Sequence, residues 1–385
     1  MKIVYSLPHP VDRLETEQAG HIVRANAILN ALESLGHEVI RVQAASGGAA
    51  SQGAAKGYRS LVKKLLPKAI AMPLRDRARV AFGKHYAERL TEIVKQEQPD
   101  VLLETHIAFS LGGTLASENT GVPIIFDDVA PSWEEAQQYG VGANDLAVKT
   151  HQQVMAQASR VVAVSAAIHQ LLIEDGVPSE KVITVSNGIN ESLFHQGVDG
   201  SAIRRQYNIP EDAVTIVFVG SFQPYHRVDL LLDAAKKLTT DKPVYLLLVG
   251  GDKDQTEQYD ASDTTIFAGR IPYENVAQYI AAGDITVMPA TNDYGNPMKI
   301  YEYMALGKAI IAPNQPTIRE IAEHGDGIYL FEQENIDDLA RALQTLIDDD
   351  ALRTQLGERA LALSPQFTWR ARAEIISNAM HEIVG

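Results

Sequence analysis

The pattern that most restricts the fold of this chain lies in residues 284–313, which run as strand, loop, helix and strand. Residues 284–289 are a short β-branched apolar run, and a second apolar run closes the stretch after a helical segment. This order is that of a parallel βαβ unit, in which the helix begins beside the carboxyl edge of the sheet. We therefore expect an α/β fold with at least one parallel sheet.

The helix of this unit has signals at both ends. Asn296 is a good N-cap, Pro297 suits the first helical position, and Gly307 can end the helix in a left-handed conformation. The free N–H groups of a helix start attract anions, and Lys299 falls in this first turn. Two interpretations stay open here: a phosphate site that includes Lys299, or a surface ion pair between Lys299 and Glu302 worth roughly 0.2–0.5 kcal/mol.

The same β/α alternation occurs in both halves of the chain. Apolar strands are predicted at residues 2–6, 38–42, 100–103, 123–126, 160–164 and 181–185, and again at 214–219, 243–249 and 265–268. The alternation pauses in a Gly-, Pro- and charge-containing segment after Phe194, so we place a domain boundary near residue 195. The prediction is an N-terminal domain over residues 1–195 and a C-terminal domain over 196–365, with a terminal helix over about 366–385 that packs back on the first.

Composition limits the functional classes. A chain of 385 residues exceeds one ordinary core, and its 45% hydrophobic and 22% charged content is that of a soluble globular protein. The absence of cysteine excludes disulfides and thiolate metal sites, and the net charge of -15 argues against nucleic-acid binding. No apolar run approaches the ~20 residues of a membrane span. The first ten residues resemble a strand and a loop rather than a signal peptide, so we expect a cytoplasmic protein.

Residues 56–95 run against this acidic balance. They hold eleven basic residues and three acidic ones, a local net charge of +8. Interleaved leucines allow this segment to lie on an anionic membrane surface or to contact an anionic acceptor, and a solvated helix face is the equally weighted alternative. We expect Pro67 and Pro73 to interrupt any long helix here.

Polar residues follow two of the predicted strands in the first half. Glu104 and His106 follow the strand at 100–103, while Asp127 and Asp128 follow the strand at 123–126. Ligands of open parallel sheets bind beyond the carboxyl ends of the strands, so these side chains are candidates for contact with a substrate. Helix capping and loop hydrogen bonding are the alternative for each of them.

A second anion-binding loop is predicted after the strand at 214–219. The segment GSFQPYHR leads into a helix and places His226 and Arg227 near the helix start, where the dipole already favours an anion. Together with Lys299 these residues could hold a diphosphate. The chain has no Walker GxxxxGK[ST], HExxH or GxSxG motif and no complete GxGxxG after its first strand, which argues against several other enzyme classes.

Taken jointly, four stretches resemble the retaining glycosyltransferases of the GT-B fold, the group usually called glycosyltransferase family 4. NPMKIYEYMALGKAIIAP is similar to the donor-loop signature of that family, GSFQPYHRVDLLLDA to its phosphate-binding loop, VSNGINESLF to its interdomain turn, and GRIPYENVAQYIAAGDITVMP to the stretch that leads to the donor base. The resemblance covers most of the chain and is strongest in its second half. It implies two Rossmann-like domains facing across a cleft.

The resemblance also implies roles for individual residues. Glu302 matches the glutamate that binds the donor ribose, and His226 stands where the family usually has a lysine against the diphosphate. The implied catalytic residues are His226, Arg227, Lys299 and Asp127. The implied donor-binding residues are Gly20, Ser221, Gly250, Arg270, Ile271, Asp293, Tyr294, Asn296, Pro297, Met298, Ile300 and Glu302. Acceptor-side candidates are Glu104, His106 and Asp128. The sequence departs from the family at Tyr294, where a glutamate that contacts the donor sugar often stands.

The function implied is transfer of a sugar from a nucleotide diphosphate sugar to an acceptor hydroxyl with retention of anomeric configuration, in polysaccharide or glycoconjugate synthesis. The reaction is expected to need no cofactor and no metal ion. The acceptor is a glycan, a lipid-linked molecule or a small molecule. Two alternatives share the donor site: a sugar-nucleotide epimerase of the GT-B fold, and a non-catalytic nucleotide-sugar binding protein, which the change at Tyr294 keeps open.

Overall fold

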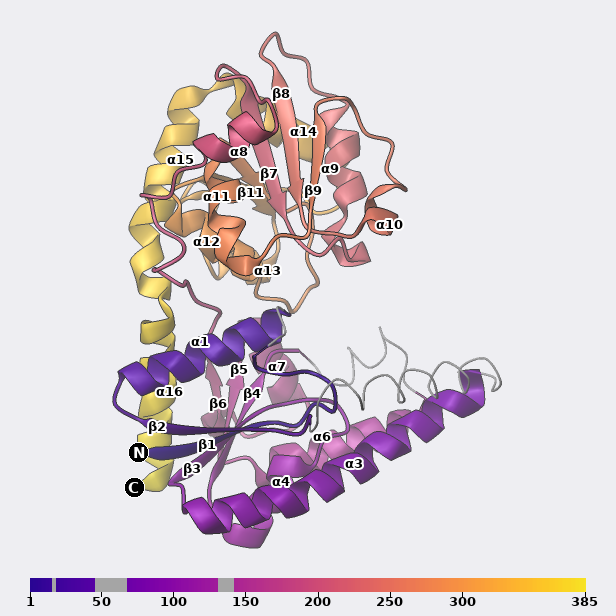
Figure 1. The fold of residues 1–385 in the computed structure, drawn as a ribbon, viewed down its shortest axis with the longest axis vertical. Helices are drawn as coiled ribbons and strands as arrows, with labels where there is room; N and C mark the ends of the chain where they lie inside the picture. Colours follow the sequence, from indigo (N-terminus) through magenta and orange to yellow (C-terminus); the bar gives the residue numbers. More distant parts are fainter. Residues whose placement is uncertain (16–18, 46–67, 131–141) are drawn as a thin grey trace. The chain divides into compact units, whose positions relative to one another are not determined.

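The computed structural model describes residues 1–15, 19–45, 68–130 and 142–385, which form two compact units (Figure 1). The first unit is Met1–Ser186 with Arg372–Gly385, and the second is Asn187–Ala371. The division after Ser186 falls earlier in the chain than the predicted boundary near residue 195. The C-terminal helix α16 (Trp369–Val384) crosses the second division, so that most of its residues group with the first unit.

The first unit contains a parallel sheet of six described strands. They are β1 (Lys2–Leu7), β2 (Glu38–Gln43), β3 (Val101–Thr105), β4 (Ile124–Asp128), β5 (Arg160–Ala163) and β6 (Val182–Thr184), in the order β2-β1-β3-β4-β5-β6. The strands are almost continuously apolar because both faces of a parallel sheet are covered. The strand order reverses between β1 and β3, which pair in parallel with Ile3 opposite Val101. This is the topological switch point of the first unit.

Helices cover both faces of this sheet (Figure 1). They are α1 (Gly20–Ser34), α3 (Lys68–Glu97), α4 (Gly112–Thr120), α6 (Asn144–Gln157) and α7 (Ala166–Glu174), with a short 3-10 helix at Ser179–Lys181. Helix α1 lies on one side of the sheet and α3 and α4 on the other. Buried leucines, isoleucines and alanines of α1 recur at helical spacing and face the sheet.

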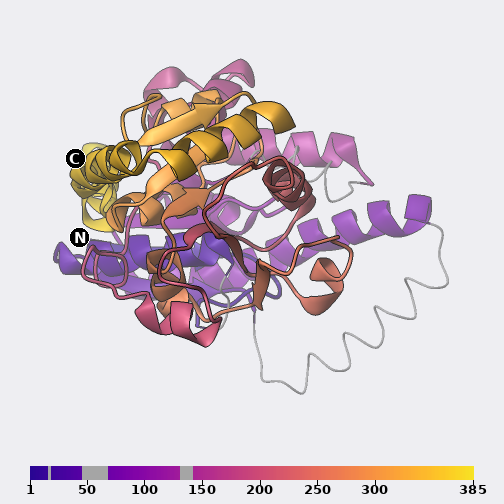
Figure 2. The same cartoon turned by 90° about the horizontal axis from the view of Figure 1, so that it is seen from above.

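Helix α3 corrects one prediction. It runs unbroken over 30 residues with Pro73 inside it, so Pro73 does not interrupt the helix as expected. Pro73 lies in the second turn, where a missing N–H removes one hydrogen bond from the ladder and leaves the rest intact. Figures 1 and 2 show the N-terminal end of α3 standing clear of the sheet of its own unit. Pro67 and the other residues of the basic segment before Lys68 lie outside the described residues.

The second unit repeats the architecture with the strand order β12-β11-β10-β7-β8-β9. Its described strands are β7 (Val214–Val219), β8 (Val244–Val249), β9 (Thr265–Gly269), β10 (Ile285–Val287), β11 (Ala309–Pro313) and β12 (Ile328–Phe331). All of these strand pairs are parallel, and the order reverses between β7 and β10. The predicted fold class, two Rossmann-like parallel-sheet domains, is confirmed.

The helices of the second unit enclose its sheet from two sides. They are α8 (Ser201–Gln206), α9 (Val228–Ala235), α10 (Lys253–Thr256), α11 (Val276–Ala281), α12 (Met298–Ala305), α13 (Pro316–Arg319), α14 (Ile336–Asp348) and α15 (Asp350–Leu363), with 3-10 helices at Pro224–His226, Tyr273–Asn275 and Ser364–Phe367. One buried cluster joins α9 and α14 to one face of the sheet, and another joins α11 and α12 to the opposite face. Figure 1 shows these two layers.

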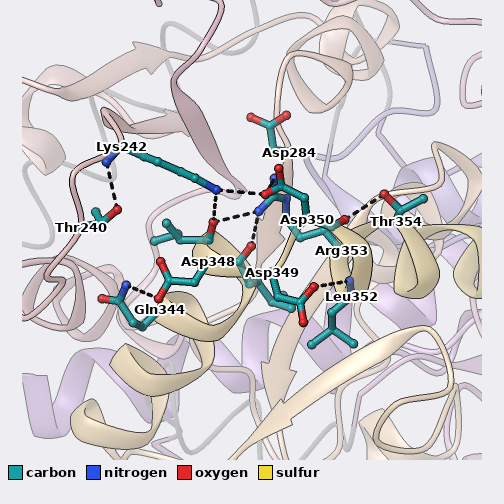
Figure 3. A network of polar contacts seen from close by, with 12 residues as sticks. Thr240, Lys242, Asp284, Gln344, Asp348, Asp349, Asp350, Leu352, Arg353 and Thr354 are labelled. Carbon is teal, nitrogen blue, oxygen red and sulfur yellow. Dashed lines mark hydrogen bonds and ion pairs between the residues drawn. The ribbon is translucent and has the colours of Figure 1, made fainter.

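A polar network fixes the junction between α14 and α15 (Figure 3). Asp349 caps α15 through a hydrogen bond from the Leu352 N–H (2.8 Å), and Lys242 Nζ donates to the Ile347 carbonyl (3.0 Å) and to Asp350 (3.0 Å). The network ties Lys242, which precedes β8, to the turn between the two helices. Among the helices that the structure describes, none is long and apolar enough to cross a membrane.

Candidate active site

The candidate site of the second unit is built at the point where its strand order reverses. The loop after β7, residues 220–227, and the loop after β10, residues 288–297, both leave the carboxyl edge of the sheet here. In open α/β sheets this switch point is where ligands bind. Helix α12 starts directly after the second loop, so its free N–H groups add a site for an anion.

The start of α12 differs from the prediction in one detail. Pro297, with φ -75° and ψ 116°, precedes the first helical residue Met298, and no side chain caps the helix. The amide of Asn296 is used elsewhere: its oxygen accepts from the Asn187 N–H (2.8 Å) and its nitrogen donates to the Tyr301 hydroxyl (2.9 Å). Asn296 is therefore not the N-cap. Gly307 has φ +62°, the left-handed conformation expected at the end of the helix.

Two glycines let the loops approach one another closely. A Cβ atom added to Gly220 would lie 3.1 Å from both His226 Cε1 and Lys299 Nζ, which places these two side chains around the end of β7. A Cβ atom on Gly250, at the end of β8, would lie 1.9 Å from the Gly220 carbonyl oxygen. Gly250 also has φ +107°, which side chains rarely tolerate. Glycine is thus required at the end of β8, where the two backbones meet.

Lys299 is the central charged group of this site. Its Nζ is buried, has no hydrogen-bond partner among the described residues, and lies 4.8 Å from the centre of the Phe218 ring. Burial lowers the pKa of Lys299 to about 7, although the nearby Glu302 carboxylate acts in the opposite direction. A buried ammonium with no acceptor is costly, and an anion placed against it would remove that cost.

Glu302 lies one turn further along α12 and is also buried. The Tyr273 hydroxyl donates a hydrogen bond of 2.8 Å to its carboxylate. Burial raises the pKa of Glu302 to about 7, opposed by Tyr273 and by the Lys299 charge. The interpretation of Lys299 and Glu302 as a surface ion pair is therefore wrong, because both functional groups are removed from solvent. Nothing in the sequence pattern pointed to Tyr273, which lies in the 3-10 helix before α11.

His226 is a second polar group of this cluster. Its ring is 8% exposed and packs edge-on against Phe218, with ring centres 5.6 Å apart. Burial and the neighbouring Lys299 charge hold the pKa of His226 far below its usual range, so the imidazole is neutral at physiological pH. Its Nδ1 has no hydrogen-bond partner within the described part of the chain. His226 therefore offers hydrogen bonding rather than a positive charge.

Other predicted donor-side residues lie around this cluster with partners of their own. Arg227, at φ +47°, forms ion pairs of 3.0 Å with Asp229 and Glu334, and the exposed Arg270 pairs with Asp252. These contacts attach both guanidinium groups to nearby carboxylates, and their roles in donor binding stay predictions. The Ser221 carbonyl accepts from Gln255 (3.2 Å).

The rest of the predicted donor set lies on the two loops and on α12. Asp293 accepts from Gln315 (3.2 Å), Tyr294 is buried, and Ile271 is half-buried. Met298 opens α12 and Ile300 packs into the core below it. Gly20 opens α1 of the first unit, where a Cβ atom would meet no atom within 4 Å. These residues stay predictions as donor ligands.

In the first unit, Asp127 is bound to a residue that the sequence did not single out. The guanidinium of Arg24, on α1, donates to both oxygens of Asp127 (2.8 and 3.0 Å) and to the carbonyl oxygens of Val185 and Ser186. Both side chains are buried. Arg24 therefore ties α1 to the end of β4 and to the residues that follow β6. These contacts give Asp127 a structural role, and its expected chemical role stays a prediction.

The three acceptor-side candidates of the first unit have different surroundings. Glu104 is buried and accepts a hydrogen bond from Ser6 (2.6 Å), and burial raises the pKa of its carboxyl to about 8, so it is uncharged at neutral pH. Asp128 is buried at the end of β4. His106 lines a cavity at the carboxyl edge of the first sheet. Contact of any of these three residues with an acceptor stays a prediction.

Comparison with known proteins agrees with this architecture. A model of the glycosyltransferase family 4 matches residues 20–193, and a model of the group 1 glycosyl transferases matches residues 199–362. The chain is 18% identical to Anabaena HepE, solved with UDP and glucose, over 99% of this chain and 100% of that one, with a TM-score of 0.74. It is 17% identical to a sucrose-phosphate synthase from Thermosynechococcus elongatus, with coverage of 100% and 99% and a TM-score of 0.74.

Curated relatives are similar over about two thirds of the chain. The protein is 27% identical over 283 residues to a D-inositol 3-phosphate glycosyltransferase of Streptosporangium roseum, which is 68% of this chain and 64% of that relative. It is 23% identical over 298 residues to an N-acetyl-alpha-D-glucosaminyl L-malate synthase of Bacillus anthracis, 71% of this chain and 72% of that relative. The two family models together with the fold show that the chain belongs to the group 1 glycosyltransferases of the GT-B fold.

Proposed function

We propose that this protein transfers a sugar from a nucleotide diphosphate sugar to an acceptor hydroxyl, with retention of configuration at the anomeric carbon. The observation that carries the proposal is the buried Nζ of Lys299, which has no hydrogen-bond partner in the described structure and faces the switch point of the second sheet beside the start of α12. An anionic diphosphate supplies the missing partner. Structures of the neighbour HepE have been solved with UDP and with UDP-glucose, which supports the same donor class.

The chemistry follows from the arrangement of charge. Breaking the bond between the sugar and the diphosphate leaves growing negative charge on the leaving phosphate. Lys299, the neutral ring of His226 and the N–H groups of α12 are fixed donors beside that position, and one such donor is typically worth roughly 2.7–4 kcal/mol of the barrier. Glu302, held by Tyr273, offers a carboxylate for ribose hydroxyls. In the mechanism we propose, the leaving phosphate accepts the acceptor proton and no metal ion takes part.

The test is a panel of UDP-, GDP- and ADP-sugars with mixed sugar, polyol and lipid-linked acceptors. Release of the nucleoside diphosphate is followed with and without acceptor. Acceptor-dependent release supports the transferase, release of an epimerised sugar without acceptor supports the epimerase, and binding without any release supports the non-catalytic alternative that Tyr294 keeps open. Loss of activity in EDTA, restored by added metal, would show that the reaction is not metal-independent.

Contact with an anionic membrane surface remains a separate proposal. Within the described part of α3, the exposed side chains of Arg77, Lys84 and Arg89 accompany Leu74, which is 51% exposed. A basic face with an apolar residue suits anionic lipid headgroups. Binding to vesicles that contain phosphatidylserine, weakened by added salt, is the expected result. Equal binding to neutral vesicles would refute it.

A further inference from the structure

Left-handed backbone conformations gather on and against the loop after β7, residues 220–227. Phe222 has φ +55° and Arg227 has φ +47°, while Glu334, whose side chain contacts Arg227, has φ +62°. A residue other than glycine keeps such a conformation only where its surroundings hold it, and these positions cluster at functional sites. The contacts that hold each of these residues therefore indicate which part of the loop depends on them.

Phe222 is held by apolar packing. Its side chain is buried, and its ring centre lies 5.7 Å from that of Phe218 and 6.3 Å from those of Tyr259 and Phe267. Aromatic contacts of this kind stabilise the core whether or not a ligand is bound. The strain at Phe222 is thus offset by the core of the second unit.

Arg227 is held by charge instead. Its Nη2 lies 3.0 Å from the carboxylate of Asp229, in the first turn of α9, and its Nη1 lies 3.0 Å from that of Glu334, in the segment between β12 and α14. Its Nε also donates to both oxygens of Asp229 (3.1 Å). Two carboxylates already neutralise this guanidinium, so a diphosphate would have to displace them to gain it as a partner.

The backbone of Arg227 sets the direction of His226. Arg227 ends the 3-10 helix of the loop and directly precedes α9, and its N–H donates to the Pro224 carbonyl (3.2 Å). A change of φ at this one junction would turn the preceding residue relative to α9. That residue is His226, whose ring packs edge-on against Phe218 and lies beside Lys299.

We propose that Arg227 is a positioning residue and not a ligand of the diphosphate. Its ion pairs with Asp229 and Glu334 hold the left-handed backbone conformation at Arg227. That conformation places the His226 ring beside Lys299. Glu334, which no sequence signal singled out, belongs to the site through this contact. The placement of the ring concerns the protein alone, whereas its effect on donor binding rests on the proposed function.

The experiment compares two variants that both lack the guanidinium. Glycine adopts a positive φ without strain and alanine does not, so Arg227→Gly and Arg227→Ala differ in the cost of the backbone conformation. The readout is the NMR signal of the His226 Cε1–H group in the whole chain with ¹³C-labelled histidine, assigned by its loss in His226→Gln. Arg227→Gly should keep this signal at its wild-type position, and Arg227→Ala should move it towards that of an exposed histidine.

Binding of UDP, measured by calorimetric titration, should follow the same order. Arg227→Ala should raise the Kd about tenfold, the effect of strain at one left-handed residue, and Arg227→Gly should raise it no more than about threefold. Glu334→Gln should raise it about threefold in the wild-type background and leave it unchanged in Arg227→Gly, where the interaction no longer exists. This pair of measurements, with the His226 signal, also serves if Arg227→Ala fails to fold.

The matched control is Asn208→Ala. Asn208 also has a left-handed backbone, with φ +52°, and is exposed in the segment between α8 and β7. This substitution introduces the same kind of strain away from the loop after β7. It should leave both the His226 signal and the Kd for UDP unchanged.

The outcomes separate this proposal from the proposed function. If Arg227 were a phosphate ligand, UDP binding would weaken equally in Arg227→Gly and Arg227→Ala, and that result would overturn the proposal. A His226 signal that is the same in these two variants would overturn it as well. Because the signal is read without any ligand, the positioning role is tested even if no nucleoside diphosphate binds, and in that case only the proposed function fails.

Discussion

Replacement of Lys299 by methionine tests the centre of the donor site. The substitution keeps the length of the side chain over the Phe218 ring and removes the buried ammonium, whose Nζ lies 4.8 Å from the ring centre. One fixed donor to the leaving phosphate is worth roughly 2.7–4 kcal/mol, so kcat should fall about 10²–10³-fold. Because the ammonium is buried without a hydrogen-bond partner in the described structure, its removal should leave the free energy of unfolding unchanged or higher.

The pH dependence of diphosphate binding gives a second, independent test of Lys299. Burial lowers the pKa of Lys299 from 10.5 to about 7 in the free protein, so above pH 7 the amine is mostly uncharged. A bound diphosphate favours the charged form, and binding then takes up one proton. Because the pKa of Lys299 is lowered in the folded protein without ligand, the affinity for the diphosphate is highest below pH 7. The affinity should weaken about tenfold for each pH unit above 7.

The assay is calorimetric titration of wild type and Lys299→Met with a nucleoside diphosphate between pH 7 and pH 9, together with the rate of nucleoside diphosphate release. Wild type should show the slope and the variant should not. Lys308→Met is a useful control: the pKa of Lys308 is also lowered by burial, yet its Nζ is hydrogen-bonded to the carbonyls of Ala281 and Gly283. That control should lose stability and keep the slope. A Lys299→Met protein with wild-type turnover and the same slope would refute the reasoning.

Three further predictions concern the scaffold. Gly250→Ala should lower the free energy of unfolding by about 3 kcal/mol, because the added Cβ would lie 1.9 Å from the Gly220 carbonyl oxygen. Gly269→Ala should lower it by only about 1 kcal/mol, because Gly269 has φ +74° but an added Cβ would meet no atom within 4 Å. Denaturant melts in which the two variants are equally destabilised would contradict this reasoning. Arg24→Met should lower the free energy of unfolding by about 3–5 kcal/mol, because it leaves the Asp127 carboxylate buried and unpaired. The double variant Arg24→Met/Asp127→Asn should recover part of that loss. No recovery in the double variant would argue against the ion pair. Burial lowers the pKa of His151 to about 4, whereas a histidine in the unfolded chain has a pKa near 6.5. The unfolded chain therefore takes up the proton first, and the free energy of unfolding should fall by roughly 3 kcal/mol as the pH drops from 6.5 to 4. Thermal melts of His151→Gln should show a shallower fall over the same pH range.

Alternation of apolar runs with helical stretches was enough to predict both parallel sheets. The predicted strand at residues 214–219 coincides with β7, and the strands at 38–42 and 265–268 differ from β2 and β9 by one residue at one end. Continuous β-branched runs bounded by glycine or charge carry this information because both faces of such strands are buried. The strand β12 (Ile328–Phe331) was not assigned from the sequence.

The site was predictable only where its residues follow one another in sequence. Lys299 and Glu302 stand one turn apart on a helix whose two ends are marked in the sequence, so their position near the helix start followed from local signals. Arg24 and Asp127 are separated by 103 residues, and no local pattern connects them. The hydrogen bond between Asn187 and Asn296 joins residues that are also far apart in sequence, so no local pattern predicts it. This hydrogen bond explains why Asn296 does not cap α12. The burial of Lys299 and Glu302 could not be predicted from the sequence either. This burial shifts the pKa values of both groups, which the sequence allowed to be an exposed ion pair.

The most direct test of the account is an NMR time course of the wild-type protein with its sugar nucleotide and an acceptor. The account predicts that nucleoside diphosphate appears together with a new glycoside whose anomeric configuration is that of the donor. A glycoside of the opposite configuration would contradict the retaining mechanism. Failure of every sugar nucleotide to release nucleoside diphosphate in the presence of acceptors would contradict the proposed function itself.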